Sequence, residues 1–190
     1  MFYHFDGPMQ TDKPNEFCTL DTQRLRLREP ELTDGEQMAA IRSDAEVNKY
    51  LERQPCLSIA EAEAFILKIQ TGVKNDGWFY WAICLKDENK LVGTICLWNV
   101  DKENAQVELG YELLPAFQGK GIMTEALEKI INLAFGALQF ERIVANTNRY
   151  NSKSVGLLKK FNFVNNTRHI TGAGLPEDEV MLVLTKSAQT

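Results

Sequence analysis

Hydrophobic residues in the first third of the chain are spaced first as in a strand and then as in helices. Leu25 and Leu27 alternate with arginines over residues 22–28, which predicts a short strand with one polar face. Capping boxes, in which Ser or Thr is followed three residues later by Glu, indicate where helices begin. They predict helices over residues 34–41 and from 59 to Gly72, with a short helix over 44–51 between them. The boxes are Thr33 with Glu36 and Ser58 with Glu61.

The middle of the chain changes to a period of two. Large apolar residues occupy every second position from Phe79 to Leu85. Residues 91–98 are apolar on both faces, as in a strand at the centre of a sheet. A further strand is predicted over residues 105–113. Short polar turns separate these strands, which predicts an antiparallel meander.

Beyond the meander the helical spacing returns. Apolar residues from Met123 to Ala134 form the stripe of a long amphipathic helix that ends at Gly136. The remaining pattern predicts a strand over 142–146, a helix over 151–161, a strand from 163 and a last strand over 180–184. Strands mixed with helices in this order predict an α/β (α+β) fold. Residues 1–19 show no period, so we interpret them as an N-terminal extension to one domain over residues 20–190.

Composition and charge exclude several classes of function. A net charge of -5 and a pI of about 5.2 argue against nucleic acid as a partner. The four cysteines form no C-x-x-C pair and there are only two histidines, so no metal is expected. No apolar run approaches the roughly 18 residues of a membrane span. The N-terminus lacks the basic start and apolar segment of a secretory signal, so a cytoplasmic location without membrane contact is expected.

The segment that points to chemistry is the glycine turn between the last meander strand and the long helix. The first N–H groups of a helix lack intrahelical partners and carry partial positive charge, which suits phosphate. Gly119 and Gly121 would let an anion approach the backbone, and Lys120 adds charge. Lys120 precedes Gly121, so the turn is not a Walker A loop, and Thr124 stands where a dinucleotide fingerprint has its last glycine. A tight strand-to-helix connection that binds nothing is the alternative.

Residues 118–123, with the sequence QGKGIM, resemble the acetyl-CoA loop of the GNAT acetyltransferase superfamily, Q/R-x-x-G-x-G/A, with Met123 where Gly or Ala is usual. Residues 20–28 and 107–111 look like the opening strand and the strand before the loop in one branch of that superfamily. This branch contains the ribosomal-protein N-terminal acetyltransferases. Residues 151–163 resemble its N-x-x-S helix, with Asn162 where Gly is usual. The matched segments follow one another in the family's order.

That resemblance implies a single GNAT-type domain, with a central, mostly antiparallel mixed sheet of about seven strands. Helices would flank the sheet, which would be splayed between its fourth and fifth strands. The co-substrate would be acetyl-CoA, with pantetheine paired to the backbone at Leu113 and Asn151 beside the cofactor. The pyrophosphate would be held by Gln118, Gly119, Lys120, Gly121, Ile122 and Met123. The acceptor would be a primary amine, either a protein N-terminal α-amine or a small molecule. Residues 44–57 and the loops around Trp98 and 170–179 would form its surface, and a homodimer is compatible with the branch.

The family's chemistry is direct attack of a neutral amine on the thioester, which needs a base for the amine and an acid for the thiolate. Glu108 is the candidate base, because it lies on the polar face of its predicted strand; an ion-paired strand glutamate and His169 as base are the alternatives. Ser154 is the candidate acid, with Tyr111, Tyr150 or a serine that only satisfies its helix as alternatives. A non-catalytic acyl-CoA-binding module and a nucleotide-dependent enzyme are the competing functions.

Overall fold

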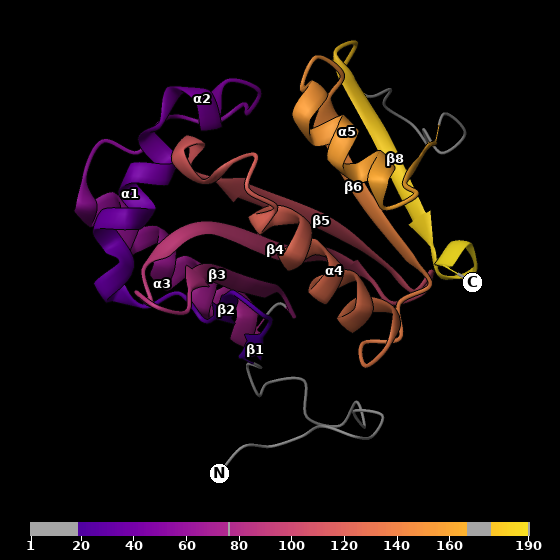
Figure 1. The fold of residues 1–190 in the computed structure, drawn as a ribbon, viewed down its shortest axis with the longest axis horizontal. Coiled ribbons are helices and arrows are strands. Elements are labelled where there is room, and N and C mark those ends of the chain that lie inside the picture. Colours follow the sequence, from indigo (N-terminus) through magenta and orange to yellow (C-terminus); the bar gives the residue numbers. More distant parts are fainter. Residues whose placement is uncertain (1–18, 76, 167–175, 190) are drawn as a thin grey trace.

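A computed structural model describes residues 19–75, 77–166 and 176–189 (Figure 1). Its strands form one eight-stranded sheet in the order β1-β2-β3-β4-β5-β6-β8-β7. The strands are β1 (Leu20–Asp21), β2 (Leu25–Arg28), β3 (Phe79–Leu85), β4 (Leu91–Asp101), β5 (Gln106–Leu113), β6 (Arg142–Asn148), β7 (Val164–Asn165) and β8 (Glu179–Thr185). The α-helices are α1 (Gly35–Ser43), α2 (Ala45–Asn48), α3 (Ile59–Asn75), α4 (Ile122–Phe135) and α5 (Ser152–Lys160). Short 3-10 helices are η1 (Leu32–Asp34), η2 (Pro115–Phe117) and η3 (Lys186–Gln189).

The sheet is mostly antiparallel and is split near its middle. β3, β4 and β5 pair antiparallel in chain order, which confirms the predicted meander and the central place of β4 within it. β5 and β6 run parallel and pair only where residues 106–108 face residues 142–144. Beyond this seam β5 continues to Leu113 and β6 to Asn148 without pairing to each other, which is the splay that the resemblance implies (Figure 1). The two-residue strands β1 and β7 raise the strand count above that expected.

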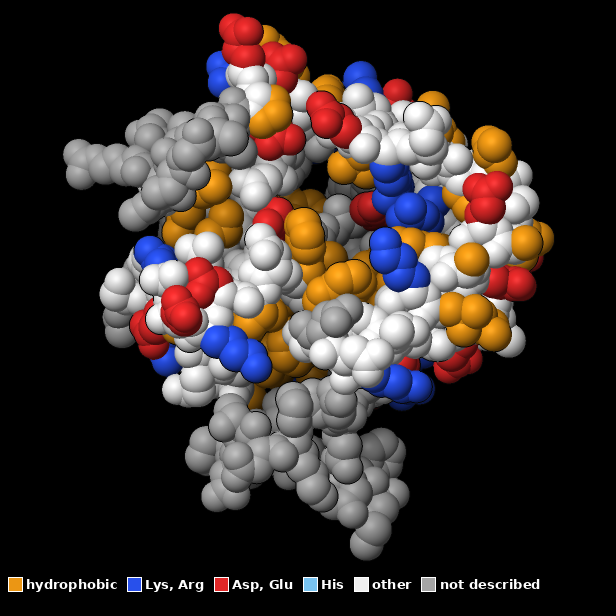
Figure 2. All heavy atoms as spheres, turned by 180° about the vertical axis from the view of Figure 1, so that it is seen from behind, with side chains coloured by type: hydrophobic (Ala, Val, Ile, Leu, Met, Phe, Trp, Pro, Cys, Tyr) orange, Lys and Arg blue, Asp and Glu red, His pale blue; other side chains and the backbone are white. Residues whose placement is uncertain are grey.

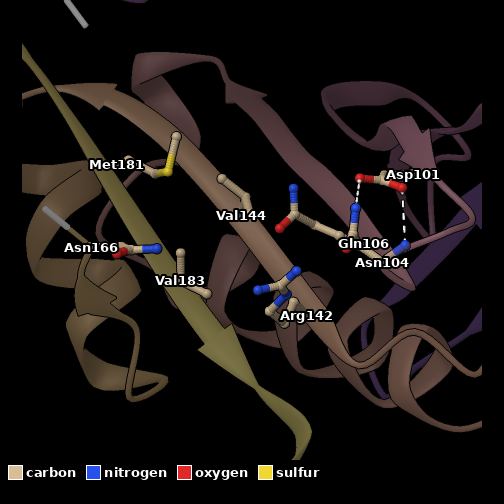
Figure 3. A pocket seen from close by; sticks show the side chains of 8 residues that line it. All are labelled: Asp101, Asn104, Gln106, Arg142, Val144, Asn166, Met181 and Val183. Carbon is tan, nitrogen blue, oxygen red and sulfur yellow. Dashed lines mark hydrogen bonds between the residues drawn. The ribbon is translucent and has the colours of Figure 1, made fainter. Parts of the chain in front are cut away.

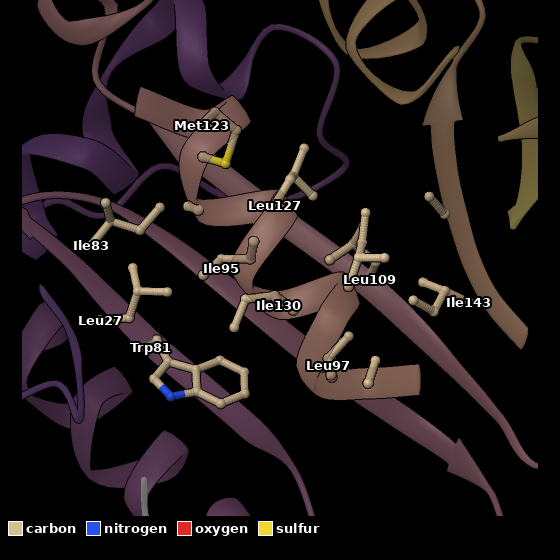
Figure 4. Packing of buried hydrophobic residues seen from close by; sticks show 14 of the residues in the cluster. Leu27, Trp81, Ile83, Ile95, Leu97, Leu109, Met123, Leu127, Ile130 and Ile143 are labelled. Carbon is tan, nitrogen blue, oxygen red and sulfur yellow. The ribbon is translucent and has the colours of Figure 1, made fainter. Parts of the chain in front are cut away.

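One face of the sheet carries the main core under α4. The apolar stripe of this helix packs onto the strands, with Leu127 and Ile130 lying over Ile95 and Leu109 (Figure 4). Full burial of each side chain of this size contributes about 1.5–3 kcal/mol. The predicted helix is confirmed, and Gly136 is its C-cap.

The opposite face is covered only in part. α1 and α3 pack over the β3–β4 hairpin through a second buried cluster: Met38, Ile41, Cys56, Ala62, Ile66, Ala82, Cys84 and Leu91. The same face of β5 lies outside that cluster, so Glu108 and Glu112 keep partial exposure. No helix in the described part of the chain is long and apolar enough to cross a membrane.

One predicted helix end and one predicted capping box are wrong. α3 continues past Gly72 to Asn75, because Gly72 provides space for Trp78 rather than ending the helix: a Cβ there would lie 2.3 Å from Trp78 Cε3. At the first helix the capping box joins Glu31 and Asp34, not Thr33 and Glu36, and the Glu31 N–H donates to the Asp34 carboxylate at 2.8 Å.

The second predicted box is half formed. Ser58 Oγ accepts from the Glu61 N–H at 3.2 Å, as a helix cap does. The Glu61 carboxylate, however, accepts from the N–H of Leu57 at 3.0 Å, one residue before the position that a full box requires.

Candidate active site

The glycine turn leaves backbone N–H groups accessible at the start of α4. Gly119 and Gly121 adopt left-handed conformations, with φ of 73° and 75°, which strain any residue with a Cβ. Gly121 is the N-cap, and the first helical bond runs from the Glu125 N–H to the Gly121 carbonyl at 3.1 Å. The N–H groups of residues 122–124 therefore precede the helical ladder. A Cβ at Gly119 would meet nothing within 4 Å, so the turn is open on that side, where an anion could approach its backbone.

Side chains of the turn contribute less than its backbone. Ile122 and Met123 are buried in the main core, so only their N–H groups can serve a ligand. This burial explains why Met stands at position 123, where the GNAT loop usually has Gly or Ala. The Met123 side chain points into the packing beneath α4 (Figure 4). Lys120 is exposed, and its ammonium nitrogen lies 5.7 Å from the centre of the Phe117 ring.

A polar network that sequence reasoning missed fixes the turn to the start of the sheet. The Glu125 carboxylate accepts from Thr22 Oγ1 at 2.5 Å and from Arg24 N and Nε at 2.7 and 2.6 Å. Arg24 Nη1 also donates to the Lys120 carbonyl at 3.0 Å. Burial raises the pKa of Glu125, but the bonds from Thr22 and Arg24 outweigh it and hold the pKa below its ordinary value. The signal in the sequence was a glutamate in the first turn of a helix together with the T-x-R sequence of residues 22–24, which form the turn between β1 and β2.

Gln118 connects the turn to both sides of the splay. Its Nε2 donates to the Leu113 carbonyl at 3.0 Å, and its Oε1 accepts from Lys153 Nζ at 2.9 Å. A ligand N–H that pairs with the Leu113 carbonyl would therefore share that oxygen with Gln118 or displace its side chain. Asn151 is the N-cap of α5, as predicted, because its Oδ1 accepts from the Ser154 N–H at 3.1 Å.

The structure brings two of the predicted acid candidates together across the splay. Tyr111 of β5 and Ser154 of α5 share a hydrogen bond of 2.9 Å between their hydroxyl oxygens. Burial raises the pKa of Tyr111 to about 12, and the bond to Ser154 acts in the opposite direction. The phenol therefore stays protonated at neutral pH. Tyr150 lies apart from this pair and is 64% exposed.

The candidate base Glu108 is held by neutral groups. Asn146 Nδ2 of β6 donates to Oε1 at 3.0 Å, and Asn99 Nδ2 donates to Oε2 at 3.3 Å. Within the described residues no cation pairs with Glu108, so the alternative of an ion-paired strand glutamate does not hold there. Neither Asn99 nor Asn146 was predicted from the sequence. Asn146 lies on β6 two residues beyond Val144, the last residue of the seam. His169 lies outside the described residues.

The base and acid candidates approach the splay from opposite faces of the sheet. Successive side chains of a strand alternate between faces, so Glu108 points away from Tyr111. Tyr111 meets α5, whereas Glu108 lies on the face that α1 and α3 cover in part. Figure 2 shows a hollow near the middle of that second face, with hydrophobic side chains inside it and Lys and Arg side chains along one side. An acceptor and a thioester could meet through the splay, each from its own face.

A shallow pocket of about 320 Å³ lies on the same face as Glu108, between β5 and β8 (Figure 3). Gln106, Arg142, Val144 and Met181 are among its lining residues. It contains none of the predicted site residues, and it lies over the closed seam rather than the splay. We therefore do not place the cofactor there.

Comparison with known proteins decides the family. Residues 24–164 match the acetyltransferase (GNAT) domain family. The uncharacterised N-acetyltransferase p20 of Bacillus licheniformis is 33% identical over 145 residues, which cover 76% of this chain and 82% of that protein. The chain belongs to the GNAT acetyltransferase family.

Two further GNAT relatives bear on the site. The ribosomal protein uS5-alanine N-acetyltransferase of Escherichia coli is 32% identical over 91 residues, 47% of each chain. The microcin C7 self-immunity acetyltransferase MccE, solved in complex with acetyl-CoA and AMP, has a TM-score of 0.71 at 22% identity, covering 86% of this chain and 93% of that one. At that identity the likeness establishes the GNAT fold. The GNAT fold binds acetyl-CoA.

Proposed function

We propose that this acetyltransferase moves the acetyl group of acetyl-CoA to a primary amine by direct attack within a ternary complex. The observation that carries the proposal is the arrangement at the splay. A carboxylate held by two neutral amides lies on one face, and a hydrogen-bonded Tyr111–Ser154 pair lies on the other. The glycine turn lies at the end of β5, where it would hold the phosphates.

The proposed roles follow from what each group can donate or accept. Glu108 takes a proton from the acceptor ammonium, directly or through water, and the neutral nitrogen attacks the thioester carbon. As the carbon–sulfur bond breaks, the Ser154 hydroxyl gives a proton to the departing thiolate, and Tyr111 supplies Ser154 in turn. The second proton, which the nitrogen loses as the amide forms, passes through water and restores Tyr111. Asn146 orients the Glu108 carboxylate and so acts as a positioning residue. The backbone N–H groups of residues 122–124 would bind the pyrophosphate.

For the acceptor we propose a protein N-terminal α-amine. The support is the uS5-alanine N-acetyltransferase among the relatives, which acts on such an amine by its name. Small-molecule amines form the comparison set in the test. It stays a prediction that residues 1–19 form an extension to the domain. The homodimer and the cytoplasmic location also stay predictions.

The test has two steps. Acetyl-CoA and adenosine triphosphate are titrated separately into the protein by calorimetry. Release of free thiol is then followed with a panel of N-terminal peptides, small amines and polyamines. We expect acetyl-CoA alone to bind and at least one amine to release thiol. Binding without thiol release from any amine would instead support the acyl-CoA-binding module, and absence of acetyl-CoA binding by folded protein would refute the proposal.

A further inference from the structure

The polar face of β5 continues from Glu108 toward α2. Glu108, Gly110 and Glu112 alternate along it, and each is partly exposed. Gly110 places no side chain of its own between the two carboxylates, and the Cys96 thiol packs beside it, since a Cβ there would lie 3.0 Å from Cys96 Sγ. We call this face, over residues 108–112 of β5, the strip. An acceptor whose amine faces Glu108 would extend along it.

The second carboxylate on the strip is already neutralised. Arg53, which follows α2, donates through Nη1 and Nη2 to the two oxygens of Glu112, the second bond at 3.1 Å. Arg53 Nε donates to Asn48 Oδ1 at 2.7 Å. The Arg53 and Glu112 side chains are 19% and 18% exposed. A bidentate pair with so little exposure is firmly held and offers a ligand little net charge.

Arg42 of α1 lies beside this pair with its own charge uncompensated. Its guanidinium carbon lies 3.6 Å from the centre of the Phe65 ring. No hydrogen bond or ion pair joins that guanidinium to another residue of the described chain. Burial lowers the pKa of Arg42 and nearby Arg53 lowers it further, whereas Glu112 raises it. The group remains cationic at neutral pH, and the ring holds it in place with its hydrogen-bond donors unused.

The negative charge of Glu108 is likewise not neutralised by its hydrogen-bond partners, because these are the neutral amides of Asn99 and Asn146. The strip therefore offers one uncompensated carboxylate and, near Glu112, one uncompensated guanidinium. Residues 108 and 112 are separated by about 13 Å along the strand. The Lys and Arg side chains along the hollow in Figure 2 lie on the side formed by the α1–α3 half of the molecule.

We propose that the acceptor carries an anionic group in addition to its amine, and that Arg42 binds this group while Glu108 faces the amine. The anion is a carboxylate or a phosphate, since a guanidinium binds both. This inference rests on the proposed acetyl transfer. An extended peptide advances about 3.3–3.6 Å per residue, so about 13 Å corresponds to roughly four residues, and the side chain of the third or fourth residue of an N-terminal peptide would reach Arg42. A polyamine would place a cation against Arg42 and Arg53 and is a poor acceptor.

The experiment compares matched peptides with a free N-terminus and an amidated C-terminus. One series carries Glu, Gln or phosphoserine at the third position, and another carries them at the fourth. The value of kcat/KM is measured by thiol release with saturating acetyl-CoA. Binding of the same peptides to protein loaded with coenzyme A is measured by calorimetry, which gives the preference even without turnover. Arg42→Gln and Arg42→Lys are tested beside Arg26→Gln, a change at an exposed arginine of β2.

We expect the anionic peptide to exceed its Gln counterpart by about 10- to 100-fold in one series, the effect of one charged hydrogen-bonded contact. The ratio should approach one in Arg42→Gln, remain in part in Arg42→Lys and stay intact in Arg26→Gln. The change should appear in KM and in peptide affinity rather than in kcat. Equal binding and turnover of acidic and neutral peptides would overturn the inference and leave the proposed acetyl transfer standing. A preference for polyamines would overturn it as well.

Discussion

Replacing Glu108 with Gln removes the proposed base while nearly preserving its shape. The carboxylate accepts from Asn146 at 3.0 Å and from Asn99 at 3.3 Å, each through a different oxygen. A glutamine amide has only one carbonyl oxygen, so its NH₂ group must face one of these donors. The substitution therefore removes the base and also one of its two positioning bonds.

The two losses differ in size. A lost hydrogen bond to a carboxylate costs about 1.5 kcal/mol at a partly exposed site, which loosens the side chain but leaves the fold intact. Loss of a general base lowers turnover by roughly 10²–10⁴, equivalent to about 2.7–5.5 kcal/mol in the barrier. Removing the base therefore raises the barrier by more than the lost hydrogen bond does, so kcat should fall by at least 100-fold. Affinity for acetyl-CoA should hold, because Glu108 lies on the other face from Tyr111 and away from the glycine turn.

The assay is thiol release at saturating acetyl-CoA with an acceptor found in the amine screen, together with calorimetric binding of acetyl-CoA. Glu128→Gln, the same change on the exposed side of α4, is the matched control. Asn146→Ala tests positioning, and its effect should largely disappear in the Glu108→Gln background. Turnover of Glu108→Gln within about threefold of wild type would exclude Glu108 as the base.

Three further predictions concern cofactor binding and stability. Lys120→Ala should weaken acetyl-CoA binding only about two- to fivefold, the value of one exposed charge, and a 100-fold loss in calorimetry would show that the side chain dominates. Asp34→Ala should lower the free energy of unfolding by about 3–5 kcal/mol in urea, because Arg28 donates two bonds of 2.7 Å to that buried carboxylate; adding Arg28→Met should restore most of the loss. Burial raises the pKa of Tyr111 from 10.0 to about 12, so the folded state keeps a proton that the unfolded chain releases. Stability that is present below about pH 10 should fall as the pH rises toward 12, and Tyr111→Phe should reduce this fall; identical urea midpoints in the two proteins across that range would contradict it.

The parts of the fold that depend on local spacing were predictable. The meander follows from its period of two and its short turns, and α4 follows from its stripe. Gly119 and Gly121 could be identified from the sequence because a turn with positive φ favours glycine. Gly72 shows the limit of such reasoning. Its role depends on the Trp78 ring that packs against it, and the sequence does not show that contact.

The partners of the catalytic candidates could not be predicted in the same way. Asn146 reaches Glu108 only because residue 108 pairs with residue 144 at the end of the seam, so register between strands that are distant in sequence decides the contact. The Tyr111–Ser154 bond likewise depends on how far β6 and α5 diverge from β5. Family resemblance named Ser154, whereas its link to Tyr111 appears only in three dimensions.

The short seam between β5 and β6 has a consequence for how the molecule opens. β6 and β8 are paired along their whole length, from Arg142 with Thr185 to Asn148 with Glu179, whereas strand pairing joins them to the meander only at residues 106–108 and 142–144. Amide protons of β6 and β8 should therefore exchange with solvent as one cooperative unit, before those of β4. A co-substrate that contacts both α4 and α5 would couple this unit to the rest of the sheet. Deuterium uptake of β8, which contributes no predicted ligand contact, should therefore slow when acetyl-CoA binds.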